Sequence, residues 1–199
     1  AFRYILTSSK FNVWTGLRNS LIYTVIGTFV AVIFTYITAF ALSRERLKGR
    51  YGLMGLFIIT WVFDAGIIPQ YIIYSQLGFV DNPWVMIIPG AINTQFLIIT
   101  KTFVEGIPKE LEEAAGMDGA NDFAVLTRVY MPLSKTILAT IATFNAVAIW
   151  NQYLIPQIYL KTDHFKVIQQ VLKEVVITDV GASTAFKNVI VNGVTLNQQ

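Results

Sequence analysis

Acidic side chains are the most concentrated reactive groups in this chain, and they gather between residues 108 and 122. The rest of the inventory is sparse, with no cysteine and a single histidine, His164. This composition excludes disulfides, thiolate metal sites, a histidine metal cluster and a histidine-based triad, so we expect no catalytic residue, cofactor or metal site. Carboxylates on an alanine-rich segment have no reason to face lipid. They must lie in water or against another protein.

Two further groups of side chains could bind a polar solute. Trp61 and Asp64 lie in one apolar run, and Trp150, Asn151 and Gln152 lie in another. Flat aromatic faces beside amide or carboxylate groups suit the binding of sugars. Other interpretations stay open, because tryptophan is common at membrane interfaces, amides join helices, and Asp64 could cap a helix end.

The composition of the chain predicts that these residues are positioned by membrane-spanning helices. Hydrophobic residues make up 54% of the 199 residues, charged residues only 14%, and the mean hydropathy is +0.55. A soluble domain usually has about a quarter charged residues. The net charge of +3 is modest and its bases are scattered, which argues against nucleic acid as a partner. We expect a fragment, incomplete at both ends, because the chain has no initiator Met and stops just after a new apolar run begins.

Four apolar runs are long enough to cross a bilayer, and a fifth begins near the end of the chain. We therefore predict an all-α, polytopic membrane protein with about five spans. The second run contains Asp64, Gly66 and Pro69, so we expect it to be kinked or broken late. The third contains Pro89 and Gly90. The runs cover residues 21–42, 51–74, 84–100, 136–160 and 185–194.

Basic residues in the short loops predict the orientation. Residues 44–50 carry four bases and residues 75–83 carry none, so the first loop is expected in the cytoplasm and the second outside. Alternation then places residues 101–135 in the cytoplasm and residues 161–187 outside. In the outer stretch the spacing predicts a short amphipathic helix on the membrane surface, with an apolar face formed by Ile168, Val171, Leu172, Val175 and Val176.

Residues 108–122, the acidic segment, have the pattern of two helices joined by a glycine turn. Pro108 suits a first helical turn, and the glutamates that follow favour the positive end of the helix dipole. Gly119 can adopt positive φ at the helix end, and Asn121 or Asp122 can cap a second helix. Pro132 follows where the chain enters the fourth run. An ordinary solvated loop between two spans is the alternative.

The segment resembles a motif of ABC importer permeases, E-A-A…G…I-x-L-P. The matching residues are Glu113-Ala114-Ala115, Gly119 and Pro132, with Val129 and Met131 as conservative departures. Other stretches look like the carbohydrate and oligosaccharide permeases related to the maltose system, including the branch for uronic-acid-rich oligosaccharides. These stretches span essentially the whole chain and comprise residues 18–20, 66–69, 77–78, 89–91 and 150–151.

The resemblance implies a single type I ABC importer transmembrane domain over residues 1–199, in a bacterial or archaeal cytoplasmic membrane. It implies a dimer of ATP-binding subunits, a second permease subunit, an extracellular solute-binding protein and surrounding lipid as partners. Residues 108–122 would form the cytoplasmic coupling helix that docks on the ATPase. The implied coupling residues are Glu113, Ala114, Ala115, Asp118, Gly119, Ala120 and Pro132.

In this family the permease itself does no chemistry but makes the access state depend on the ATPase state. Glu113 is the residue expected to pair with a base of the ATPase, and a solvated helix charge of little energetic value is its alternative. A channel or secondary transporter subunit, or an ABC permease for a non-sugar solute, are the competing functions. An intramembrane enzyme would need catalytic groups that the apolar runs lack.

Overall fold

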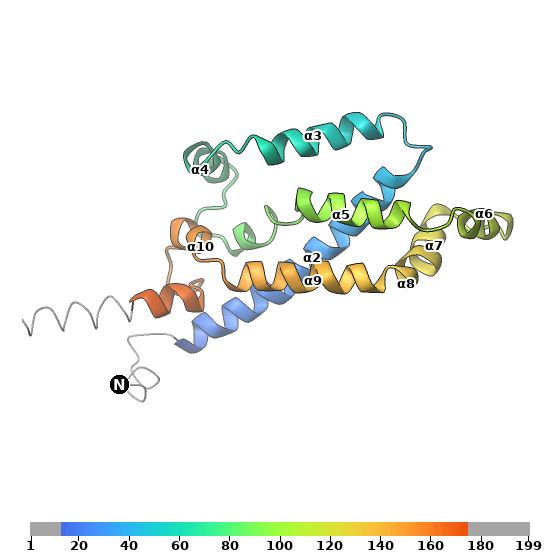
Figure 1. The fold of residues 1–199 in the computed structure, drawn as a ribbon. Helices are drawn as coiled ribbons and strands as arrows, with labels where there is room; N and C mark the ends of the chain where they lie inside the picture. Colours follow the sequence, from blue (N-terminus) through green and yellow to red (C-terminus); the bar gives the residue numbers. More distant parts are fainter. Residues whose placement is uncertain (1–12, 175–199) are drawn as a thin grey trace, which may run out of the picture.

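A bundle of helices around one long central helix forms the part of the chain that the computed structural model describes, residues 13–174 (Figure 1). The central helix is α2 (Val13–Ser43), and α5 (Thr94–Glu105) and α9 (Lys135–Trp150) pack along it. Within the described residues there is no strand, which agrees with the predicted all-α class. The predicted first span, residues 21–42, lies inside α2, which begins earlier, at Val13.

The second apolar run is broken, as its sequence predicted. It forms α3 (Arg50–Val62) and α4 (Ile67–Gln76), whose axes are bent by 116°. The break contains Gly66, whose φ of 80° is unfavourable for other residues. Pro69 is not the cause, because it lies in the first turn of α4, where its missing N–H group costs little.

The third run is not the continuous span over residues 84–100 that the sequence predicted. It begins with the short 3₁₀ helix η1 (Pro83–Met86), continues through turns, and becomes helical only at Thr94. The Asn93 side chain caps α5 by accepting hydrogen bonds from the backbone N–H groups of Gln95 (2.9 Å) and Phe96 (3.3 Å). Because of this cap and of Pro89 and Gly90 before it, the helix begins ten residues later than predicted and continues to Glu105.

The fourth run is also interrupted, so residues 136–160 are not one helix. α9 ends at Trp150, and a separate helix, α10 (Leu154–Tyr159), follows. Before α9, the short helix α8 (Met131–Leu133) contains Pro132, and the chain bends by 80° between the two. Among the helices within residues 13–174, α2 is the one that could cross a membrane by length and composition, and up to three spans result if each bent pair counts as one. The expected fifth span lies outside the described residues.

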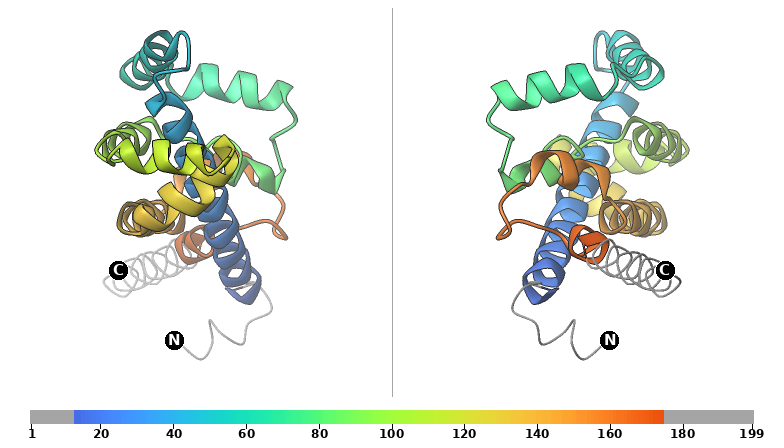
Figure 2. Two further views of the ribbon diagram at one scale, coloured as in Figure 1. Left: turned by 90° about the vertical axis from the view of Figure 1, so that its right-hand side faces the viewer. Right: turned by 90° about the vertical axis from the view of Figure 1, so that its left-hand side faces the viewer.

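The two ends of the bundle hold different elements (Figures 1 and 2). One end carries the loop after α2 together with α6 (Glu110–Met117), α7 (Asp122–Val125) and the π-helical η2 (Leu126–Tyr130). The opposite end carries α4, η1 and α10. The loops 44–50 and 106–134 thus share an end, and residues 75–83 lie at the other, as the charge pattern predicted.

Apolar clusters stabilise both ends of the bundle. At the end that carries α6, aromatic and aliphatic side chains of α2, α5, α7 and η2 form the apolar end cluster of Tyr36, Phe40, Val104, Val125, Leu126 and Tyr130. The Tyr36 hydroxyl donates a buried hydrogen bond of 2.9 Å to Ser134 Oγ. The opposite end is packed around Tyr23, Val85, Met86, Tyr159, Leu160 and Val167.

The beginning of α2 is bound to residues 164–171. Asn19 Nδ2 donates hydrogen bonds to the carbonyl oxygens of His164 (2.7 Å) and Lys166 (3.0 Å). Ser20 Oγ accepts one from the backbone N–H of Ile168 (2.9 Å). The predicted amphipathic helix is present over residues 168–174, and Val171 packs against Gly16 while Leu172 is exposed. Val175 and Val176 lie outside the described residues.

Candidate functional site

The acidic segment folds as helix, glycine turn and helix, as its sequence predicted. α6 begins after Pro108, and the N–H groups of Glu112 and Glu113 donate to the carbonyl oxygen of Lys109 (3.0 Å each). It ends in a Schellman motif, in which Gly119 N–H donates to Gly116 O and Ala120 N–H to Ala115 O (3.0 Å each). Asn121 Oδ1 caps α7 by accepting from Ala124 N–H at 2.8 Å.

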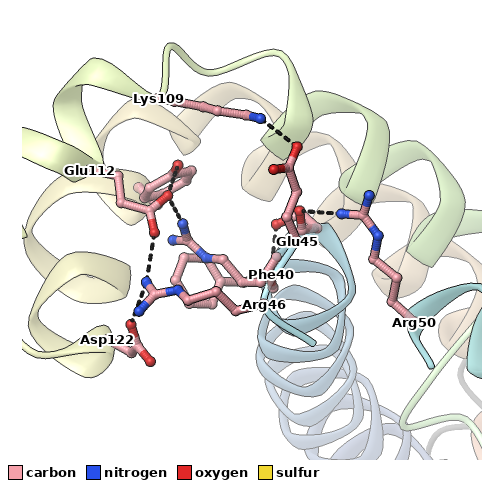
Figure 3. Close-up of polar contacts among 10 residues, drawn as sticks. Phe40, Glu45, Arg46, Arg50, Lys109, Glu112 and Asp122 are labelled. Carbon is pink, nitrogen blue, oxygen red and sulfur yellow. Dashed lines mark hydrogen bonds and ion pairs between the residues drawn. The ribbon is translucent and has the colours of Figure 1, made fainter. Parts of the chain in front are cut away.

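A cluster of charges joins this segment to the loop that follows α2 (Figure 3). Glu112 forms ion pairs with Arg44 and with Arg46 (3.0 Å), and it accepts a hydrogen bond from the Tyr130 hydroxyl (3.3 Å). Arg46 also contacts Asp122 at 3.2 Å. We call these five residues the Arg44 cluster. Three separate stretches of the chain, residues 44–46, 112–122 and 130, meet in it.

Arg44 is the most enclosed charge of the cluster. Its guanidinium carbon lies 3.9 Å from the ring centre of Phe40 and 4.6 Å from that of Tyr130. The Arg44 side chain is only 13% exposed and that of Glu112 only 22%. Burial lowers the pKa of Arg44, but an arginine stays protonated near neutral pH. The Arg44–Glu112 ion pair is therefore largely shielded from solvent.

A second ion pair links the same two stretches but lies in solvent. Lys109 Nζ is 2.5 Å from Glu45 Oε1, and the two side chains are 65% and 67% exposed. The hydrogen bond between them lowers the pKa of Glu45 and raises that of Lys109. Because solvent screens exposed pairs, this contact contributes little to stability.

The predicted coupling residues divide into two sets. Ala115 and Ala120 are half-buried and pack against the apolar end cluster, so they position the segment. The others face solvent: Glu113, Ala114, Asp118, Gly119 and Pro132. Glu112 was missed by sequence reasoning, although the four bases of residues 44–50 were a signal that a carboxylate partner was needed.

The outer surface of the segment also presents large apolar side chains. Met117 is 84% exposed and Phe123 70%, and Leu111 is exposed as well. Beside them a hollow of about 440 Å³ is lined by Ala115, Asp118, Gly119, Ala120, Asn121, Ala124, Arg128 and Val129. Apolar groups next to carboxylates and a hollow are features of a protein interface.

The two predicted solute-binding groups lie at the opposite end, each at a helix break. Trp61 lies in the last turn of α3, and Asp64 Oδ1 accepts a hydrogen bond from Gly66 N–H (3.1 Å) in the turn before α4. Trp150 ends α9, and its carbonyl oxygen accepts from the Gln169 side chain. Asn151 and Gln152 follow in the turn. α2 and α5 lie between α3 and α9, so the structure does not bring the two groups together (Figures 1 and 2).

This fold, with a bundle of apolar helices and a charged helix–turn–helix segment at one end, is that of an inner-membrane transport component. Residues 21–170 match the family described as "Binding-protein-dependent transport system inner membrane component". The chain belongs to this family and is a multi-pass component of the inner, cytoplasmic membrane.

Similar proteins carry more specific descriptions. The chain is 39% identical over 181 residues to the polygalacturonan/rhamnogalacturonan transport system permease protein YtcP of Bacillus subtilis (strain 168), covering 91% of this chain and 63% of that protein. It is 38% identical over 177 residues to Protein LplC of the same organism, covering 89% and 59%. The chain thus spans about three fifths of the length of these relatives.

A solved structure has the same fold. It is described as a bacterial ABC transporter involved in the import of the acidic polysaccharide alginate. The match has a TM-score of 0.83 at 34% identity and covers 96% of this chain and 67% of that one. This likeness confirms the predicted ABC importer fold.

Proposed function

We propose that this chain is the permease part of an ATP-driven, binding-protein-dependent importer of oligosaccharides. One observation carries the proposal. The acidic segment extends from one end of an apolar bundle and presents Glu113 and Met117 outward, in a chain of the binding-protein-dependent transport family. Such a surface is expensive to leave in water and is suited to a docked partner.

In this proposal the docked partner is one of two ATP-binding subunits. Glu113, Ala114, Asp118 and Gly119 face the partner, while Ala115 and Ala120 hold the segment against the apolar end cluster. Pro132 lies at the bend where the segment passes into α9. Closure of the ATPase dimer would move the segment and so change which side of the bundle is open.

The proposal also includes a second permease subunit, surrounding lipid and an extracellular binding protein. Every residue of α3 and α4 is at least partly exposed, and most of these side chains are large and apolar. Apolar helix faces inside a membrane are covered by lipid or by another helix. The family description supports the binding protein.

We infer oligosaccharides, including acidic ones, as the solute class, because two of the similar proteins described above are named for polygalacturonan or alginate transport. Trp61 with Asp64, and Trp150 with Asn151 and Gln152, are proposed for solute contact. Their place at helix breaks supports this, since irregular backbone at membrane depth normally lines a cavity.

Cross-linking tests the docking surface. Ala114→Cys is exposed on α6, and Ala65→Cys is an equally exposed substitution at the opposite end. Because the chain has no cysteine, each variant offers one thiol. In membranes that hold the full-length permease and its ATP-binding subunits, Ala114→Cys should form a cross-link to the ATPase and Ala65→Cys should not. Cross-linking at neither Ala114 nor Met117 would contradict the proposal.

Transport kinetics test the solute contacts. Trp150→Ala and Asn151→Ala should raise the KM for uptake, because each removes a face or an amide that binds sugar. Asp64→Asn is informative in either direction, since a carboxylate that contacts the solute would repel an acidic one. If KM and ATPase stimulation stay unchanged in all three variants, these residues pack helices and the solute is held elsewhere.

A further inference from the structure

The Arg44 side chain contacts three elements at once: the central helix α2, α6 of the acidic segment, and η2 beyond that segment. Arg44 follows directly after α2, Glu112 lies in the first turn of α6, and Tyr130 ends η2. The Arg44 guanidinium pairs with Glu112 and lies over the rings of Tyr130 and of Phe40, which belongs to α2 itself. Arg44 therefore links α2, α6 and η2 through one enclosed side chain, beside the more exposed Arg46, which also pairs with Glu112.

The remaining contacts between these elements constrain their geometry less. Arg46 also pairs with Glu112 (3.0 Å) and Asp122 (3.2 Å), but its side chain is 72% exposed and solvent screens both pairs. The apolar end cluster holds α2, α7 and η2 together, but apolar contact is non-directional and permits small shifts. The Glu45–Lys109 pair joins the same stretches, but it lies in solvent and is screened. The Phe40 and Tyr130 rings meet edge to face at 76°, and the Arg44 guanidinium lies in the corner that they form while its Nη1 pairs with Glu112, which fixes direction as well as distance.

We propose that Arg44 is a positioning residue for energy coupling, which ties α6 to the end of α2 through Glu112 so that a displacement of the acidic segment is transmitted to the central helix. This inference rests on the proposed function, because it supposes that a partner moves the segment. It assigns the transmission to a residue that does not itself touch the partner.

Charge alone does not satisfy this role. Arg44→Lys keeps the positive charge but loses the planar guanidinium, which lies over the Phe40 and Tyr130 rings and pairs with Glu112 through Nη1. We therefore expect the lysine variant to bind the ATPase normally and to couple at an intermediate level. Glu112→Gln keeps the shape of the side chain and removes its charge, so it should resemble Arg44→Ala.

The experiment measures ATPase activity of the full-length permease with its ATP-binding subunits, with and without solute-loaded binding protein. Coupling between sites is typically worth about 5–150-fold, and we expect Arg44→Ala and Glu112→Gln to lower the stimulated rate about tenfold. The amount of ATPase that co-purifies should not change. The matched control, Lys109→Ala, removes the exposed pair between the same stretches and should keep full stimulation.

A covalent link provides a rescue that a general packing defect would not show. Glu45→Cys and Lys109→Cys place two thiols on the exposed sides of these stretches in a chain that has no others. In the Arg44→Ala background, a short thiol-reactive bridge between them should restore stimulation. Full stimulation in Glu112→Gln, or no recovery with the bridge, would overturn the role of Arg44. Failure of the unsubstituted permease to bind any ATPase would instead overturn the proposed function.

Discussion

At the scale of single residues, Gly116 and Gly119 differ in the backbone that each must adopt. Gly119 has a φ of +81°, which ends α6, whereas Gly116 is an ordinary helical residue three positions earlier. A Cβ atom at either position would meet open space. Substitution at Gly119 is therefore penalised by backbone strain alone, and Gly116 is its natural control.

Gly119→Val should weaken the Schellman turn and abolish uptake. A left-handed conformation costs a residue with a side chain about 1–2 kcal/mol, and a β-branched one pays more. Gly116→Ala should be neutral or favour the helix by up to about 1 kcal/mol. Gly119→Asn should be intermediate, since asparagine tolerates positive φ. Solute uptake and the amount of co-purified ATPase are measured for the three variants. Normal uptake in Gly119→Val would show that transport does not require the glycine turn.

The residue scale also shows where sequence reasoning reached its limit. The motif directed attention to Glu113, but the carboxylate that binds the rest of the chain is its neighbour Glu112. Both are acids in the same helix, and a local pattern cannot rank them. What separates them is Arg46, 66 positions away in sequence, and Arg44 beside it. The turn at Gly119 was predictable because its cause is local.

At the scale of elements, the causes of the helix breaks are partly local and partly distant, and the local break in the second run was the one predicted. Asp64 and Gly66 marked the end of α3 correctly. In the third run, Pro89 and Gly90 were noted, but the cap at Asn93 that starts α5 was overlooked. The end of α9 is different, because the Trp150 carbonyl is satisfied by Gln169, far along the chain.

The junction of α2 with residues 168–171 depends on the absence of a side chain at Gly16. A Cβ there would lie 3.1 Å from a Val171 methyl and 3.2 Å from Ile168 Cα. Gly16→Val should therefore destabilise the protein by about 1–3 kcal/mol, because backbone must move. Gly52→Val, in open space on α3, is the matched control. Thermal unfolding in detergent measures both, and equal melting temperatures would contradict the close approach.

A second contact at this end of the bundle predicts a dependence on pH. Asp81 Oδ1 accepts hydrogen bonds from the backbone N–H groups of Lys161 (3.1 Å) and Thr162 (2.9 Å), and its carboxylate also binds the Thr162 hydroxyl. Hydrogen bonds from Thr162 lower the pKa of Asp81. Because the folded pKa is below the unfolded value of about 3.9, the stabilisation is present above that pH. It is lost as the pH falls through the folded pKa.

Asp81→Asn should remove this acid dependence while preserving the turn. Asp81 has a φ of 55°, and asparagine tolerates this region as well as aspartate does. The unfolding temperature of the parent protein should fall more steeply below about pH 4 than that of the variant. If the unfolding temperatures of the parent and of Asp81→Asn fall in parallel from neutral to acidic pH, protonation of Asp81 is not coupled to folding.

At the scale of the whole molecule, one end of the bundle holds the ion pairs of the Arg44 cluster, and the other is joined by hydrogen bonds of Asn19 and Asp81. The first should face the cytoplasm and the second the outside. Met117→Cys and Gln76→Cys are exposed probes of the two ends. A membrane-impermeant thiol reagent should label Gln76→Cys from outside and Met117→Cys only after permeabilisation. The reverse pattern would overturn the orientation.

The exposed side chains of Leu111, Met117 and Phe123 also affect the amount of permease that accumulates in a cell. In a subunit made without its partner, this apolar surface would stay uncovered at the cytoplasmic end of the bundle, where chaperones and proteases recognise such surfaces. Copies in excess of the partner would be degraded, and matched copies would be shielded. The surface that we propose for docking would then also set the ratio of permease to ATP-binding subunits, because permease copies that have no partner are degraded.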